Sequence, residues 1–323
     1  MYPVKYNDLR SFCNAYKIDF ATCIQVLENP VYESFSIPKK RGGKRTIESP
    51  NESLKQIQSC IARYLTTLYH APEQVHGFVQ KQKGSIAKDN LSNAQMHLQN
   101  RYLLNLDIKD FFHAISARKV LAALQLEPFG FTKEFAAQLA LLCAYQGRLP
   151  MGAPSSPIVS NIVCRTLDFR LTQLLRQSFA DAIVYTRYAD DLSFSSIDAF
   201  PLFFDQLVID ALWKEGFEVN PKKYRMAGPK QAKYVTGIKV NKKLNVDRRY
   251  YRLLRAILHD AETNGLSKAL QNYARHHQSN KAITEKQFLR ILLGKIKYME
   301  RVKGKENFAI EKLHQRLKAL SVA

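Results

Sequence analysis

Three aspartates stand where a pair of divalent cations could be held. Asp107 ends the apolar run 102–106, and the adjacent Asp190 and Asp191 lie between two apolar runs. Two Mg²⁺ ions about 3.5 to 4 Å apart, held by carboxylates, neutralise phosphate charge and align the attacking hydroxyl in nucleotidyl transfer. Mg²⁺ prefers hard oxygen ligands and keeps water molecules, so a few aspartates suffice. We therefore expect these carboxylates to bind two Mg²⁺ ions.

The neighbourhood of the Asp–Asp pair decides between two interpretations. Such a pair alone is more often a solvated turn than a metal site. Here it lies between predicted strands at 182–188 and 191–196, which together predict a hairpin. Burying like charges at its turn without a cation would be costly. The pattern therefore favours the metal site.

The charge of the chain points to a polyanionic partner. Its 323 residues hold 49 Lys and Arg against 28 Asp and Glu, a formal net charge of +21. Residues 241–323 contain 19 basic and 7 acidic residues, a surplus of 12. We expect this segment to face phosphates; the alternatives are a solvated basic face and attraction to a membrane surface.

Neither the cysteines nor the N-terminus indicates an extracellular or membrane protein. The five cysteines are widely spaced, with no Cys-x-x-Cys or Cys/His cluster, so reduced thiols in a cytosol are expected. The first ten residues carry charges where a signal peptide would be apolar, and no run of about 18 apolar residues occurs. We expect a cytoplasmic protein without a membrane partner.

The elements that would position these carboxylates follow from the patterns of apolar residues. Helices are predicted at 5–29, 51–70, 116–124, 131–146, 155–178 and 198–215. Strands are predicted within 32–48, joined by a turn at 41–44, and at 102–107, 182–188, 191–196, 217–226 and 233–240. The remainder is predicted to be helical, with Arg248, Arg252 and Arg255 on the face opposite to Tyr250 and the leucines.

Five segments, in order over roughly residues 37–240, resemble the motifs of reverse transcriptases. Residues 188–191 match Tyr-x-Asp-Asp, and residues 106–112 match the motif that carries the first metal ligand. The other three, at 44–47, 149–157 and 216–223, are similar to the fingers, nucleotide-pocket and lysine motifs. The chain is therefore identified as a member of this family, whose metals would bind to Asp107, Asp190 and Asp191.

The resemblance also implies the residues that bind the nucleotide. Phe112 would block a ribose 2′-OH, the alternative being ordinary core packing. Arg45 and Lys39 would grip the triphosphate. Lys223 would donate a proton to pyrophosphate, with Lys222 as a rival and a solvated loop charge as the alternative.

The nucleotide-pocket motif departs from the family pattern at one position. Met151, beside Gly152, stands where the family usually has Gln. Contacts to the incoming nucleotide or template at Met151 are thereby put in doubt, although the glycine and prolines that shape the backbone remain.

Two further strings resemble the retron branch of these enzymes. Asn93–His97 matches Asn-Ala-x-x-His, and Val235-Thr236-Gly237 matches Val-Thr-Gly. Asn93 and His97 would share one face of a helix. The resemblance implies that both bind RNA, together with Val235, Thr236 and Gly237. For either motif alone, the alternative is a capping Asn and a core His. Arg248, Tyr250, Arg252 and Arg255 would add stacking and phosphate contacts.

The retron resemblance implies an activity and several partners. Such an enzyme copies its cognate structured non-coding RNA from deoxynucleotide triphosphates, priming from an RNA 2′-OH to make branched RNA–DNA. It would act in a bacterial cytoplasm, in antiphage defence with an accessory effector protein, and host RNase H would remove the template. Other bacterial reverse transcriptases, of group II intron or diversity-generating type, and a catalytically idle RNA-binding scaffold are the alternatives.

The expected fold class is α+β with the right-hand polymerase architecture. We expect N-terminal helices and fingers at 1–100, and a palm at 101–240 whose antiparallel sheet is backed by helices. Fingers helices would be inserted at about 116–150. A short, basic, helical thumb would follow at 241–323.

Overall fold

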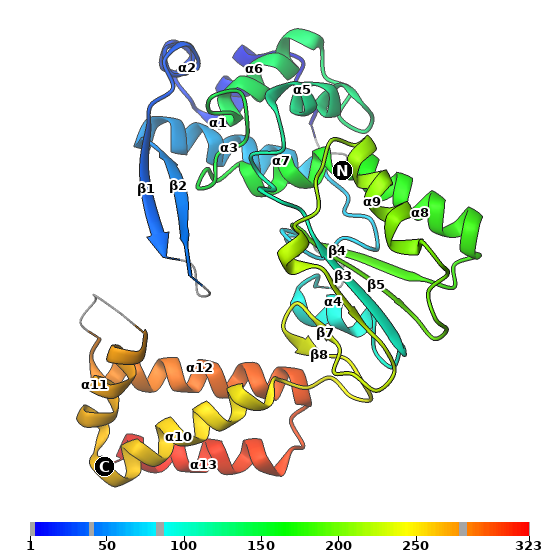
Figure 1. Cartoon of the computed structure of the whole chain (residues 1–323). Coiled ribbons are helices and arrows are strands. Elements are labelled where there is room, and N and C mark those ends of the chain that lie inside the picture. The colour runs from blue at the N-terminus through cyan, green and yellow to red at the C-terminus, as the bar shows by residue number, and fades with distance from the viewer. Residues whose placement is uncertain (1–3, 39–41, 82–86, 278–282, 323) are drawn as a thin grey trace. The chain divides into compact units, whose positions relative to one another are not determined.

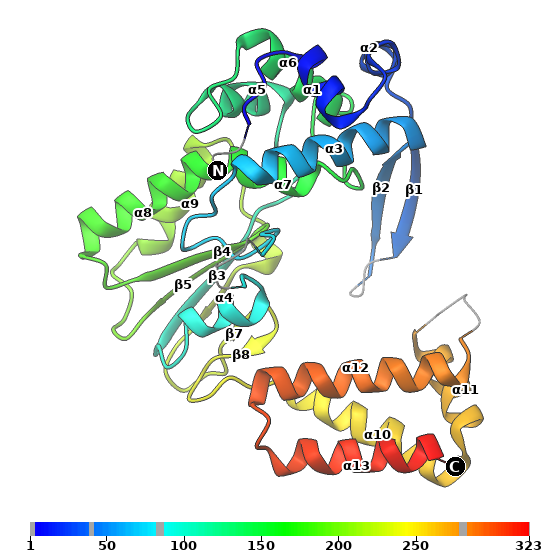
Figure 2. The same ribbon diagram turned by 180° about the vertical axis from the view of Figure 1, so that it is seen from behind.

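The computed structural model describes residues 4–38, 42–81, 87–277 and 283–322. The chain divides into two compact units, one of residues 1–93 and 102–228 and one of residues 94–101 and 229–323. Figures 1 and 2 show the two units from opposite sides.

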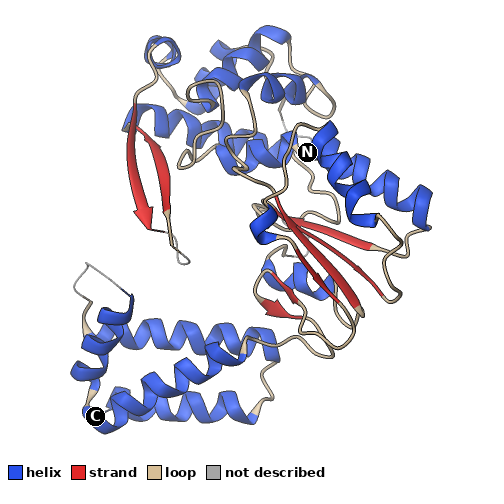
Figure 3. Ribbon diagram, viewed as in Figure 1, coloured by secondary structure: helices blue, strands red, loops and turns tan. Residues whose placement is uncertain are grey.

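The centre of the first unit is a four-stranded antiparallel sheet with the strand order β4-β5-β3-β6. Its strands are β3 (Tyr102–Asp107), β4 (Val184–Tyr188), β5 (Asp191–Ser196) and β6 (Arg225–Ala227). Helices α8 (Arg165–Phe179) and α9 (Phe204–Lys214) lie on one side of it (Figure 3). The expected mixed architecture, an antiparallel sheet backed by helices, is confirmed.

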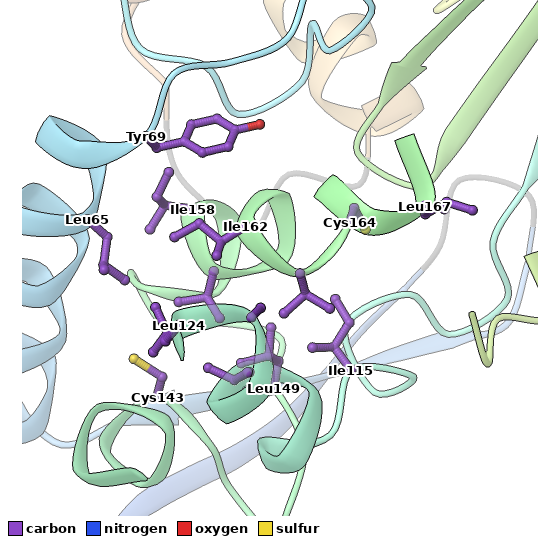
Figure 4. Close-up of a cluster of buried hydrophobic side chains, with 14 of the residues drawn as sticks. Leu65, Tyr69, Ile115, Leu124, Cys143, Leu149, Ile158, Ile162, Cys164 and Leu167 are labelled. Carbon is purple, nitrogen blue, oxygen red and sulfur yellow. The ribbon is translucent and has the colours of Figure 1, made fainter. Parts of the chain in front are cut away.

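A separate two-stranded hairpin and a group of helices complete the first unit. The hairpin pairs β1 (Tyr32–Pro38) with β2 (Lys44–Pro50). The helices are α1 (Leu9–Tyr16), α2 (Phe20–Glu28), α3 (Glu52–Leu68), α5 (Ala117–Gln125), α6 (Lys133–Cys143) and α7 (Ser156–Val163). Buried apolar side chains of α3, α5, α6 and α7 meet in the core, among them Leu65, Leu124, Cys143 and Ile158 (Figure 4).

Two predicted helices are each divided in the structure. The segment predicted at 5–29 forms α1 and α2, because Lys17 adopts a left-handed φ of 55° and the Asp19 side chain accepts the N–H of Thr22 to begin a new helix. The segment predicted at 155–178 forms α7 and α8, which meet at Cys164, where ψ is −2°. Apolar periodicity alone did not reveal either break.

The strand predicted at 217–226 is also shorter than expected. Pro221–Lys223 form a 3₁₀ turn (η1), and only Arg225–Ala227 pair with β3. Proline cannot donate a ladder hydrogen bond, and the Asn220 side chain caps the turn by accepting the N–H of Lys222.

The second unit is mainly helical. It contains β7 (Tyr234–Val235) and β8 (Ile238–Lys239), and α4 (Asn90–Met96) crosses from one unit to the other. Its other helices are α10 (Arg248–Asn264), α11 (Leu266–His277), α12 (Glu285–Lys303) and α13 (Phe308–Val322). Thr236 and Gly237, with φ of 46° and 83°, form the turn between β7 and β8; a single strand predicted at 233–240 was therefore wrong.

Helix α10 has the two faces expected from its sequence, with one exception. Leu254, Leu258 and Ala261 are buried, whereas the arginines at 248, 252 and 255 are exposed. Leu253, predicted to pack, is 48% exposed. Within the described ranges, no helix combines the length and apolar character needed to cross a bilayer.

Candidate active site

Strand pairing brings the three predicted aspartates together. Asp107 ends β3 directly opposite Asp191, the first residue of β5. Tyr188 pairs with Asp191 across a two-residue turn of Ala189 and Asp190, in which Ala189 has a φ of 58°. Carboxylate oxygens of Asp107, Asp190 and Asp191 all lie within 4.8 Å of one another. The convergence expected from the sequence is therefore observed.

Backbone hydrogen bonds hold Asp107 in this position. The N–H of Ile108 donates to the carbonyl of Asp190 at 2.9 Å, and the N–H of Asn220 donates to the carbonyl of Asp107 at 2.8 Å. The end of β3 is thus tied to the Tyr188–Asp191 turn on one side and to η1 on the other.

The electrostatics of the cluster suit a bound cation. Removal from water, together with the neighbouring carboxylates, raises the pKa of Asp190 and raises the pKa of Asp191 to about 7. Adjacent carboxylates that resist ionisation are stabilised when a divalent cation neutralises their charge. Three hard oxygen donors gathered within 4.8 Å therefore fit Mg²⁺.

Lys223 is the basic side chain of η1 that contacts these carboxylates. Its Nζ lies 2.5 Å from Oδ2 of Asp107 and 3.9 Å from Oδ2 of Asp190. Lys222 is exposed, and its backbone N–H donates to the Asn220 side chain. The two lysines that the sequence left as rivals therefore have different surroundings.

Glu48 connects three segments that were predicted to bind the nucleotide. This buried carboxylate, three residues after Arg45 on β2, accepts a hydrogen bond from Arg148 at 2.9 Å and pairs with His113 at 3.2 Å. Its backbone N–H donates to the carbonyl of Met151. Sequence reasoning missed Glu48, although a lone acid in a basic strand was a signal that could have pointed to it.

The other residues predicted to bind the nucleotide lie on β2 and beside the aromatic core. Arg45 is exposed on β2. Phe112 is half-buried, with ring centroids 6.0 Å from Phe78 and 5.4 Å from the buried Phe111. Lys39 lies outside the described residues.

Gly152 packs closely against β2. Its φ is 142°, and a β-carbon there would lie 2.7 Å from the carbonyl oxygen of Glu48. The loop that carries Met151 and Gly152 therefore requires glycine at this contact.

A buried polar network lies behind the Tyr188–Asp191 turn, and the sequence did not reveal it. Arg187, which has no exposed surface, donates from Nε and Nη2 to the two carboxylate oxygens of Asp168 at 2.8 and 2.7 Å. Tyr185 donates to the same carboxylate at 2.8 Å. A charge within an apolar strand is the signal that could have identified Arg187.

The residues predicted to bind RNA divide into buried and exposed groups. Asn93, His97 and Val235 are buried, so in this structure their side chains are within the protein and do not present a surface. The hydroxyl of half-buried Tyr250 donates to the carbonyl of Lys295 at 3.2 Å. Arg248, Arg252 and Arg255 are exposed, and Arg255 lies over the ring of Tyr251.

The second unit also contains a basic hollow that sequence reasoning did not identify. Its volume is about 590 Å³, and its cationic lining residues are Arg101, Lys233, Lys239, Lys242 and Lys243. Asn100, Asn241 and Asn245 also line this hollow. Clustered cations and amides provide donors of the kind that bind phosphate and sugar oxygens.

Comparisons with known proteins agree on one family. The family model "Reverse transcriptase (RNA-dependent DNA polymerase)" matches residues 37–240. The retron Ec86 reverse transcriptase of Escherichia coli is 33% identical over 235 residues, covering 71% of this chain and 69% of that protein. The retron Mx65 reverse transcriptase of Myxococcus xanthus is 35% identical over 247 residues, covering 71% of this chain and 55% of that protein.

A solved structure shares the fold at much lower identity. The telomerase of Candida albicans, in complex with a fragment of telomeric RNA, aligns with a TM-score of 0.50 at 12% identity. The alignment covers 92% of this chain and 64% of that chain. The likeness concerns the fold alone and agrees with the right-hand polymerase architecture.

Proposed function

Because this chain belongs to the retron reverse transcriptases and is an RNA-directed DNA polymerase, we propose that it copies a cognate structured non-coding RNA into single-stranded DNA by two-metal nucleotidyl transfer. The DNA would be primed from an RNA 2′-OH, which yields a branched RNA–DNA molecule. The observation that carries the metal chemistry is the convergence of Asp107, Asp190 and Asp191 within 4.8 Å.

The three aspartates would hold two Mg²⁺ ions. When bound, the ions would supply charge neutralisation on the phosphates and align the attacking hydroxyl with the α-phosphate. Lys223, already beside Asp107, would give a proton to the leaving pyrophosphate. Its ammonium would also balance carboxylate charge before metal binds.

The incoming deoxynucleotide would be selected by the segments that Glu48 connects. Arg45 and Lys39 would pair with the triphosphate, while Phe112 would fill the space that a ribose 2′-OH needs. Met151 and Gly152 would line the base side of the pocket. The Glu48 contacts to Arg148 and His113 support this assignment, because they join β2 to the segments that follow Phe112 and precede Met151.

The cognate RNA would bind to the second unit. The exposed arginines of α10 and the basic hollow lined by Arg101, Lys233, Lys239, Lys242 and Lys243 place positive charge on this unit, as a structured RNA requires. Thr236 and Gly237 of the β7–β8 turn would contribute to this surface, and the buried His97 and Val235 would support it. Asn93, which belongs to the first unit, remains an RNA-binding candidate from the retron motif. From the retron resemblance we further propose that the enzyme acts in a bacterial cytoplasm. It would serve antiphage defence together with an accessory effector protein, and host RNase H would remove the template.

The test uses the full chain with the RNA that copurifies with it, Mg²⁺ and the four deoxynucleotides. The wild type should make DNA that is covalently joined to RNA. Treatment with a debranching enzyme should release the DNA, which a denaturing gel shows as a change in mobility. Asp107→Asn, Asp190→Asn and Asp191→Asn should each abolish synthesis and leave RNA binding in place. Asp110→Asn is the matched control, since Asp110 belongs to the same motif but is exposed and outside the carboxylate cluster.

Two results would contradict this proposal. Undiminished synthesis by any of the three triad variants would remove the two-metal mechanism. DNA that carries no covalently attached RNA would remove 2′-OH priming and leave only the polymerase activity.

A further inference from the structure

The residue before the Tyr188–Asp191 turn is a fully buried arginine, and each nitrogen of its guanidinium has a hydrogen-bond partner. Arg187 alternates with Tyr185 on β4, so both side chains point to the same face of the sheet, where Asp168 of α8 accepts from each. Burial by itself would lower the pKa of the Arg187 guanidinium, but the adjacent Asp168 carboxylate raises it above its usual value. The guanidinium is therefore charged and rigidly held.

A second branch of this network leads to the turn. Nη1 of Arg187 donates to Oδ1 of Asn161 at 2.9 Å, and Nδ2 of Asn161 donates to the carbonyl of Gly77 at 2.9 Å. Gly77 in turn lies against the turn, because a β-carbon on it would overlap the backbone nitrogen of Ala189. Asn161 is thus the link between the buried ion pair and the segment that supports Ala189.

The backbone just before Gly77 is tied to the same strand. The N–H of Arg187 donates to the carbonyl of Gln74 at 2.8 Å, and the N–H of His76 donates to the carbonyl of Arg187 at 2.9 Å. Nη1 of Arg187 also makes a long contact of 3.5 Å with the carbonyl of Ala189. The turn is therefore contacted from two sides: by the Arg187 side chain of its own strand, and by the backbone of residues 74–77.

We propose that Asn161 and Arg187 are positioning residues for the metal ligands Asp190 and Asp191. They hold the Gly77 segment and the backbone of Ala189 in register, and this sets the separation of the two carboxylates from Asp107. The inference rests on the proposed two-metal mechanism and adds the residues that tune its metal affinity. Groups that orient metal ligands in this indirect way typically change metal affinity or activity about 10- to 100-fold when lost.

The test measures metal binding directly as well as catalysis. Asn161→Leu removes both hydrogen bonds of the link while leaving the pair of Arg187 and Asp168 in place. Bound Mn²⁺ is quantified by electron paramagnetic resonance on the full chain with its RNA, and the Mg²⁺ dependence of DNA synthesis is measured in parallel. We expect about 10- to 100-fold weaker Mn²⁺ binding and a similar rise in the half-saturating Mg²⁺ concentration, with RNA affinity unchanged.

Gln58→Leu is the matched control for loss of a buried amide. Gln58 is fully buried in α3 and donates from Nε2 to the carbonyl of Leu142 and to the hydroxyl of Tyr32, both at 2.8 Å. Neither of these partners belongs to the Tyr188–Asp191 turn. The control should melt at a lower temperature than the wild type and bind Mn²⁺ with wild-type affinity.

Asn161→Thr serves where the leucine variant fails to fold. The threonine side chain is too short to join Arg187 to Gly77. Its hydroxyl would instead donate to a backbone carbonyl in the preceding turn of the helix. Folded Asn161 variants with wild-type Mn²⁺ affinity would overturn the positioning role. If the wild type and Asp190→Asn bind Mn²⁺ equally, the proposed metal site itself is refuted. The two failures are therefore distinguishable.

Discussion

The α-carbon of Gly77 lies so close to Ala189 that a β-carbon on Gly77 would overlap the Ala189 nitrogen and lie 2.9 Å from the carbonyl carbon of Tyr188. Both neighbours are backbone atoms, which cannot rotate away as a side chain can. The segment at 74–77 and the Tyr188–Asp191 turn therefore fit only while residue 77 has no side chain.

Gly77→Ala should displace the turn that carries Asp190 and Asp191. We expect kcat for DNA synthesis to fall on the order of 100-fold, because a shift of about 1 Å in a catalytic group has this effect. Gly228→Ala is the control, since a β-carbon at Gly228 meets nothing within 4 Å. Steady-state rates at saturating RNA give the comparison; equal rates for the two variants would mean that the turn tolerates the displacement.

Lys223→Ala should reduce kcat by about 10²- to 10⁴-fold, the usual contribution of a general acid. Lys222→Ala replaces an exposed lysine that forms no ion pair within the described part of the chain, and it should leave kcat near the wild-type value. Single-turnover incorporation of one deoxynucleotide separates chemistry from product release. A larger loss for Lys222→Ala would reassign the proton donor.

Phe112→Ala should admit ribonucleotides. Opening the space beside the ribose should lower the ratio of kcat/KM for deoxy- over ribonucleotides by about 10- to 200-fold, since pocket contacts of this size discriminate by about 1–3 kcal/mol. Phe111→Leu is the control, because Phe111 is a buried core neighbour whose replacement should lower the melting temperature only. An unchanged ratio in Phe112→Ala would indicate that Phe112 serves core packing.

Replacing Arg248, Arg252 and Arg255 together by Ala should weaken RNA binding and flatten its salt dependence. Each lost phosphate contact reduces the slope of log K against log salt by about 0.7 to 0.9, so a decrease of about 2 to 3 is expected. Fluorescence anisotropy over a salt series measures it. The control replaces exposed cations of the first unit by Ala, at Arg118, Arg176 and Lys214, and should have the wild-type salt slope. If the α10 variant also has the wild-type slope, RNA binds elsewhere.

His76 should make the fold sensitive to acid. It is 5% exposed, and burial together with the charge of Lys88 lowers the pKa of its imidazole to about 4. Between pH about 6.5 and about 4 the unfolded chain binds this proton and the folded chain does not, so stability falls as pH falls, by roughly 3 kcal/mol in total. Urea unfolding across this range measures the loss.

The matched pair for that experiment is His76→Gln and His70→Gln. The first should show a smaller loss of stability between pH 6.5 and 4. The second replaces an exposed histidine and should follow the wild-type curve. Parallel curves for all three proteins would assign the acid sensitivity to other groups.

Much of the candidate active site could be predicted from the sequence because its signals are local. Alternation of apolar residues predicts the β4–β5 hairpin, and a two-residue turn leaves Asp190 and Asp191 little conformational choice. Asp107 ends an apolar strand, and burial of that strand beside the hairpin brings the third carboxylate to the other two. The order of the motifs along the chain indicated the reverse transcriptase family, and the comparisons confirmed this assignment.

Other features depend on contacts between residues far apart in the chain, which no local pattern encodes. Lys223 contacts Asp107 because Pro221 and Asn220 turn the chain at η1. Asn93 and His97 are polar and were expected to bind RNA, yet they are buried, since packing of whole elements decides which polar groups lose water. Arg187 is paired with Asp168, 19 residues earlier; only the docking of α8 on the sheet could supply a buried partner for that charge.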